Sequence, residues 1–223
     1  MSTQESQIPF VGSWIELTKT NWNIALAERN FSVRFVFNLL FCFATYMILT
    51  RILIAHRLAP GVIISDPFYS HYRPANCSLG IFLFTYASIF SFLYYVIPQP
   101  VVFFYAVRGF LALFALRVAF IFLMPLQPAS DLIVLTDPFT DQVVGFHGAV
   151  LNDLFFSGHV GDCCFFVFCC QNKSIRNFLI FAAVCTSAML IFQKVHYTAD
   201  VLAAPFFAYA CYVVFVKGHL SDR

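Results

Sequence analysis

Runs of about twenty apolar residues recur along this chain and restrict its fold more than any other feature. A helix needs about 20 such residues to cross roughly 30 Å of hydrocarbon. With 61% hydrophobic residues, 11% charged residues and 30 Phe among 223 positions, the chain is too apolar for a water-soluble core under a polar shell. The pattern predicts an all-α, polytopic integral membrane protein.

The apolar runs predict six transmembrane helices, three of them long and the last three shorter, with polar groups near their ends. They are 35–55, 78–97, 101–124, 154–170, 177–194 and 196–216. An even number of spans places both termini on one side of the membrane. The chain then divides into an N-terminal segment (1–33), a six-helix membrane domain (34–216) and a short tail (217–223).

The N-terminal segment mixes apolar and charged residues from Val11 to Asn30 and holds both tryptophans, Trp14 and Trp22. That mixture predicts a helix lying in the membrane interface, anchored by the tryptophans. A poorly ordered cytosolic tail is the alternative. The first thirty residues contain no apolar signal-peptide core, so the first span is expected to act as the membrane signal.

Basic residues indicate the orientation of the chain. Most lie on the side of the termini: Lys19, Arg29, Arg34, Lys173, Arg176, Lys217 and Arg223, against Arg57, Arg73 and Lys194 in the opposite loops. The positive-inside rule then predicts cytoplasmic termini and places the loops 56–77 and 125–153 on the lumenal or exoplasmic face. The thirteen Lys and Arg form no stripe, so nucleic acid is not an expected partner.

The eight cysteines point to packing. Seven lie in apolar runs, so no disulfide framework is indicated. The Cys163-Cys164 and Cys169-Cys170 pairs match no zinc spacing, and no His follows them at ligand distance. We therefore expect neither a metal nor another cofactor.

Two polar clusters interrupt the hydrophobic sequence, each where an apolar segment begins. His196 and Asp200 are four residues apart, so on one helix face the carboxylate could hold an imidazole N–H and leave the other ring nitrogen as nucleophile or base. The positive end of the same helix would favour an anionic oxygen such as that of a phosphate.

The second cluster is Ser157-Gly158-His159. Gly158 permits close backbone approach, the Ser157 hydroxyl can donate to an anion, and His159 can act as a general acid. Arg117 lies about seven residues inside the third span, roughly 10 Å from its end. A buried guanidinium needs an anionic partner. Membrane-embedded His, Asp and Arg are costly and usually functional.

These motifs resemble a known family. The stretches 154–159 (Leu-Phe-Phe-Ser-Gly-His) and 196–201 (His-Tyr-Thr-Ala-Asp-Val) look like the last two motifs of the sphingomyelin synthase branch of the type 2 phosphatidate phosphatase superfamily, and 117–125 is similar to its Arg-containing stretch. The resemblance covers roughly residues 34–216. It implies that His196 attacks phosphorus, Asp200 orients it, and His159 serves as acid and then base.

The chain departs from the phosphatase branch at its cations. That branch has Lys seven residues before the Arg, where Phe110 stands here, and Ser-Arg before the last His, where Met189 and Leu190 stand. A phosphodiester monoanion needs fewer cations than a phosphomonoester dianion. The sequence therefore favours an intact phospholipid donor.

The leading hypothesis is transfer of a phosphocholine or phosphoethanolamine headgroup from a phospholipid to ceramide or diacylglycerol through a phosphohistidine. The alternatives are a lipid phosphatase or phosphodiesterase with water as acceptor, and a non-catalytic lipid-binding protein. The oligomeric state, including a homo-oligomer, is left open.

The headgroup site is expected to use carboxylates and aromatic faces near the two clusters. The predicted substrate-binding set is Arg117, Ser157, Gly158, Asp153, Phe156 and Tyr197, with Phe139, Asp141, Phe146 and Phe155 also available. Asp162 is expected either to orient His159 or to line the lipid cavity. Arg108 is expected to snorkel or to pair structurally.

Overall fold

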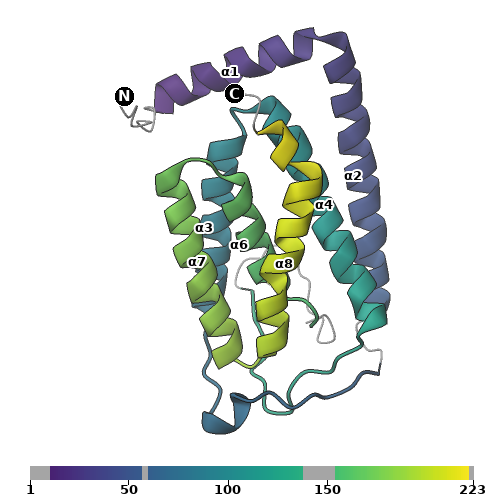
Figure 1. Ribbon diagram of the computed structural model, residues 1–223, viewed down its shortest axis with the longest axis vertical. Helices are drawn as coiled ribbons and strands as arrows, with labels where there is room; N and C mark the ends of the chain where they lie inside the picture. Colours follow the sequence, from purple (N-terminus) through teal and green to yellow (C-terminus); the bar gives the residue numbers. More distant parts are fainter. Residues whose placement is uncertain (1–10, 57–59, 138–153, 221–223) are drawn as a thin grey trace.

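The computed structural model describes residues 11–56, 60–137 and 154–220, and the regular structure in these ranges is helical, with no strand. Five helices are long and apolar enough to cross a membrane (Figure 1). They are α2 (Arg29–His56), α3 (Ser78–Val96), α4 (Pro100–Leu123), α7 (Lys173–Phe192) and α8 (Thr198–Phe215). The structure thus supports a polytopic all-α membrane protein.

The predicted fourth span is shorter than expected, so a count of six spans is not confirmed. Helix α6 (Gly158–Cys169) has 12 residues, about 18 Å at 1.5 Å per residue. Its start is delayed because the preceding backbone pairs with the His196 segment: Ser157 N donates to Asp200 O at 3.2 Å, and Leu154 O faces the His196 ring at 3.0 Å.

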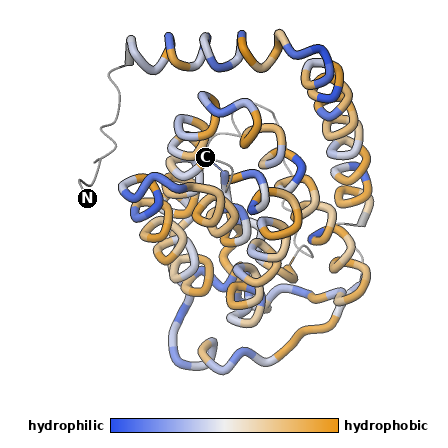
Figure 2. Tube along the Cα trace, turned by 45° about the horizontal axis from the view of Figure 1, so that its top comes forward, coloured by the Kyte–Doolittle hydropathy of each residue, from blue (hydrophilic) through white to orange (hydrophobic). Residues whose placement is uncertain are grey.

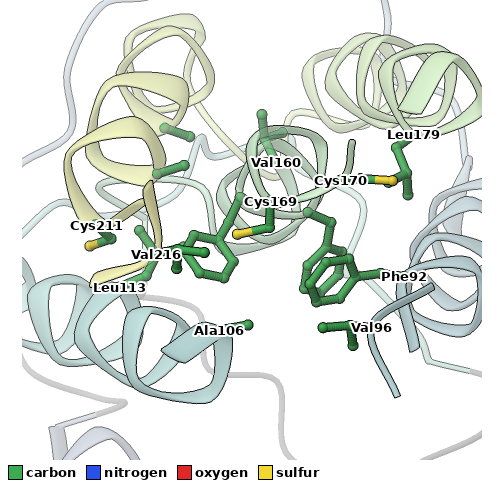
Figure 3. Packing of buried hydrophobic residues seen from close by; sticks show 14 of the residues in the cluster. Phe92, Val96, Ala106, Leu113, Val160, Cys169, Cys170, Leu179, Cys211 and Val216 are labelled. Carbon is green, nitrogen blue, oxygen red and sulfur yellow. The ribbon is translucent and has the colours of Figure 1, made fainter. Parts of the chain in front are cut away.

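Helix α6 occupies the middle of the bundle, in contact with α3, α4, α7 and α8. Figure 3 shows Val160 and Cys169 of α6 among side chains from the surrounding helices. The core includes Phe92 and Val96 of α3 and Leu113 of α4. All eight cysteines are free thiols. A central, buried α6 holds the Ser157-Gly158-His159 motif in a fixed position.

The outside of the bundle is apolar, as a lipid-facing surface requires. Phe206 and Leu79 have 77% and 74% of their surface exposed, and large apolar side chains are exposed on each of the five long helices. Figure 2 shows hydrophobic residues along these helices and more hydrophilic stretches in α1 and the loops. Such large apolar exposure suits hydrocarbon better than water.

Helix α1 (Val11–Ala27) lies across one end of the bundle (Figure 1). Trp14 Nε1 donates to Tyr94 O at 2.9 Å and Trp22 Nε1 donates to Ile97 O at 2.7 Å. These indole groups satisfy carbonyls at the C-terminal end of α3, which lack partners within the helix. The poorly ordered alternative for residues 11–27 was therefore wrong.

Helix α2 packs mainly on α4. Within this pair, Arg108 Nε donates to Asn38 Oδ1 at 2.6 Å, and its guanidinium lies 4.5 Å from the Phe104 ring centroid. Arg108 thus pairs structurally, as one of the two sequence interpretations predicted.

Candidate active site

The two sequence motifs meet at the ends of α6 and α8 that point away from α1 (Figure 1). The backbone joins them directly, because Ser157 N donates to Asp200 O and the His196 ring contacts Leu154 O. Residues 42 and 43 positions apart in sequence therefore meet in one buried region.

His196 has a defined tautomer. Its Nδ1 lies 3.0 Å from Leu154 O, and a carbonyl oxygen can only accept, so Nδ1 carries the proton. This leaves Nε2 with a lone pair. The Asp200 Oδ2 atom lies 3.7 Å from Nδ1. The Asp200 side chain is 0% exposed and the His196 side chain is 3% exposed. The carbonyl holds the ring directly, with the carboxylate next to it; the orienting role of Asp200 stays a prediction.

The α8 N-terminus is occupied by protein carboxylates, contrary to the anion site expected there. Asp66, from the loop after α2, accepts from Thr198 N at 2.6 Å and from Thr198 Oγ1 at 3.2 Å. Asp200 Oδ2 accepts from Tyr197 N at 3.0 Å. These two side chains cap the helix, so protein carboxylates and not a substrate phosphate satisfy the N–H groups of Tyr197 and Thr198.

Replacing Asp66 by alanine should lower the free energy of unfolding by about 1–2 kcal/mol, because the cap of α8 is lost. Denaturant titration of the purified protein in detergent measures this change. Glu16→Ala, which removes an exposed acid on α1, is the charge-matched control and should shift stability by less than about 0.5 kcal/mol. Equal effects of the two variants would contradict the assigned cap.

The α6 N-terminus differs from that of α8, since its N-cap residue, Ser157, makes no side-chain cap hydrogen bond. The Arg117 guanidinium lies against Gly158, where an added Cβ would clash with Arg117 Nη1. Ser157 Oγ and His159 Nδ1 are buried and lack a hydrogen-bond partner among the described residues. Buried polar atoms normally have partners, so these two fit a bound polar group.

His159 lies in the first turn of α6 and contacts α3. Its ring packs edge-on against Phe82, with centroids 5.7 Å apart, and Arg117, His196 and Asp137 lie within electrostatic range of it. Asp137 accepts from Tyr86 Oη at 2.7 Å. The structure therefore brings His159, His196 and Arg117 into one electrostatic neighbourhood.

The remaining predicted binding residues have mixed surroundings. Phe156 is fully buried, stacks on Phe207 at 4.4 Å and lines a cavity beside Arg117. Tyr197 Oη donates to Gln127 O at 2.8 Å, and its ring stacks on Tyr69 at 5.5 Å. Tyr197 is thus held by protein groups. Predicted residues Asp153, Phe139, Asp141 and Phe146 lie outside the described residues.

A buried lysine near the site was missed by the sequence interpretation, which used it only to infer orientation. Lys194, 4% exposed, donates to Asp131 Oδ2 at 2.7 Å and to Tyr69 O at 2.9 Å. Tyr69 Oη in turn donates to His196 O at 2.7 Å. Burial and the nearby Asp66 carboxylate raise the pKa of Tyr69 above its usual range, so it remains a donor. A lone Lys just before His196 was the available signal.

The positions of the missing phosphatase cations are packed with apolar side chains. Phe110 stacks on Phe166 with centroids 6.0 Å apart. Leu190 is 0% exposed, and the Met189 sulfur lies close to Gly80. These side chains belong to the packing between helices and supply no charge to the site.

The fold and site define a helical membrane protein with two histidines, a buried carboxylate and an arginine around one helix start. Residues 152–217, which contain both histidine motifs, match the family model described as PAP2 superfamily C-terminal. The match supports placement in the type 2 phosphatidate phosphatase superfamily, and with it a lipid phosphatase or phosphotransferase type of function. No curated protein and no solved structure matches the chain.

Proposed function

We propose that the protein transfers a phosphocholine or phosphoethanolamine headgroup from a phospholipid to a lipid alcohol, ceramide or diacylglycerol. The observation that carries this proposal is the His196 tautomer. Nδ1 is engaged by Leu154 O, so Nε2 is available as nucleophile, in a site that also holds His159 and Arg117. The resemblance to the sphingomyelin synthase branch supports the same chemistry.

The first half of the reaction forms a phosphohistidine. His196 Nε2 attacks phosphorus, the bond from phosphorus to the glycerol oxygen breaks, and protonated His159 gives its proton to that oxygen, which releases diacylglycerol. Arg117 and the α6 N-terminus stabilise the negative charge on the phosphoryl oxygens. Splitting one transfer into two steps is the advantage of a covalent intermediate.

The second half reverses these events with a new alcohol. The acceptor hydroxyl gives its proton to His159, its oxygen attacks phosphorus, and the bond from phosphorus to His196 Nε2 breaks. His159 is then protonated again for the next cycle, so no other proton carrier is required. The residues named supply every proton and bond change.

A diester donor is supported by the small number of cations near the site in the described part of the chain. Arg117 is the cation against Gly158, whereas Lys194 is paired with Asp131 and Phe110, Met189 and Leu190 are apolar. A phosphomonoester dianion would demand more positive charge than this. The proposal includes a non-cytoplasmic site and cytoplasmic termini, in accord with the distribution of basic residues.

The test is product analysis with headgroup-labelled phosphatidylcholine and phosphatidylethanolamine, each with and without ceramide or diacylglycerol. We expect label in the acceptor lipid when an acceptor is present. Release of free phosphocholine in its place, with no labelled lipid at any acceptor concentration, would favour a phosphodiesterase. Absence of any turnover would favour the lipid-binding alternative.

A further inference from the structure

A cavity of about 210 Å³ lies between α2, α4 and α6, next to the proposed site. Its polar lining comes from Arg117, Gly158 and Asp162. Its apolar lining comes from Tyr46, Phe110, Leu113, Phe114 and Phe156. The cavity is therefore amphipathic, and Arg117 borders both it and the neighbourhood of His159.

The cavity has a direction along the membrane normal. Arg117 lies toward the loop end of α4, and Phe110 is seven residues earlier, roughly 10 Å toward the end covered by α1. A lipid with its polar end at the site points its chains the same way. A phospholipid headgroup would point in the opposite direction, toward the loops. The apolar part of the cavity thus fits the chain region of a lipid.

Asp162 distinguishes between the lipids that could enter. A carboxylate accepts hydrogen bonds and gains most from ligands that donate them. The glycerol esters and phosphate of a phospholipid donate none. Diacylglycerol has one hydroxyl donor, whereas an N-acyl amino alcohol such as ceramide has hydroxyl and amide N–H donors near the start of its chains. The carboxylate in the cavity lining therefore favours the ligand with several donors.

We propose that this cavity is the subsite for the acceptor lipid and that Asp162 determines its preference for an acceptor with several hydrogen-bond donors. This proposal rests on the proposed transfer reaction, because lipid binding alone would define a lipid site and not an acceptor site. Asp162 then accepts hydrogen bonds from the polar part of the acceptor, and the aromatic side chains from α2 and α4 cover the beginning of the acceptor's hydrocarbon chains.

The experiment measures binding of short-chain fluorescent ceramide and diacylglycerol to purified protein in nanodiscs. His196→Ala is present throughout to prevent turnover. We expect ceramide to bind about tenfold more tightly than diacylglycerol, because one additional hydrogen bond to a charged group changes an affinity by about this factor. Adding Asp162→Asn should weaken ceramide binding about tenfold and diacylglycerol binding less than about threefold. Asp162→Glu, which keeps the carboxylate, should retain the preference.

Glu16→Gln, an acid-to-amide change on the exposed face of α1, is the matched control and should leave both affinities unchanged. A second measurement uses Asp162 unaltered: ceramide methylated on its primary hydroxyl should bind about tenfold more weakly. The methylated ceramide tests the role of the acceptor hydroxyl even if the Asp162→Asn variant does not fold. Equal binding of ceramide and diacylglycerol, or equal loss of both in Asp162→Asn, would overturn the assignment of Asp162.

The binding results are separable from the transfer assay. Preference for ceramide without any headgroup transfer would overturn the proposed function and leave a lipid site selective for several donors. Transfer without this preference would overturn the acceptor subsite and leave the proposed function standing.

Discussion

Replacing His196 by alanine should reduce kcat/KM for headgroup transfer by at least about 10³-fold, because the variant has no nucleophile to form the covalent intermediate. The Leu154 carbonyl and the Asp200 carboxylate would remain in place, so the loss would be chemical. Transfer from labelled phosphatidylcholine to ceramide and to diacylglycerol, at several concentrations of each, measures it.

His71→Ala is the matched control for this loss. His71 is an exposed histidine in the loop between α2 and α3, on the same side of the bundle as the site, and its ring contacts the neighbouring Ser70 hydroxyl at 2.9 Å. Its removal should leave transfer within about twofold of the starting value, since exposed substitutions have small effects. His196→Ala activity above a tenth of the original would rule out the nucleophile assignment.

Replacing His159 by asparagine should reduce transfer by about 10² to 10⁴-fold, the usual contribution of a general acid or base. The loss should depend on the leaving group. With p-nitrophenyl phosphocholine the leaving oxygen is weakly basic and needs little protonation, so phosphohistidine formation should survive in the variant. The second half-reaction should still be slow, because no base takes the proton of the acceptor.

Stopped-flow absorbance checks this prediction. His159→Asn should release one equivalent of p-nitrophenol per active site in a burst and then turn over slowly. The same variant combined with His196→Ala should show no burst. If His159→Asn slows the first step as much with p-nitrophenyl phosphocholine as with phosphatidylcholine, His159 is not the acid that protonates the leaving oxygen.

Much of the fold was predictable because membrane spans depend on composition over long windows. The predicted segments 78–97 and 101–124 correspond to α3 and α4 within a residue or two at each end. The fourth predicted span was the weak point. Residues 154–157 are as apolar as a helix start requires, yet they run beside the α8 N-terminus and pair with it. A hydrophobicity average over a sequence window contains no information about such a pairing between distant segments.

The proximity of the candidate site residues was predictable where short motifs carry them. Ser157-Gly158-His159 and His196 with Asp200 are local patterns, and backbone contacts bring the two segments together. The partners that fix them are distant or belong to the backbone. The Leu154 carbonyl that sets the His196 tautomer has no side-chain signal, and Asp66 reaches Thr198 across 132 positions.

The occupied α8 terminus shows the limit of reasoning from one helix alone. A free helix N-terminus favours an anion, but the protein supplies that anion itself through Asp66. The uncapped start of α6, beside Arg117, takes its place in the proposed mechanism.

In the proposed mechanism, His196 carries the headgroup during transfer. The direct measurement is peptide mass spectrometry of protein mixed with isotope-labelled phosphatidylcholine without acceptor, quenched in base to preserve phosphohistidine. We expect labelled phosphocholine on His196, lost when ceramide or diacylglycerol is added before the quench and absent in His196→Ala. Rapid transfer with no label on His196, or label on another residue that turns over at the rate of transfer, would contradict it.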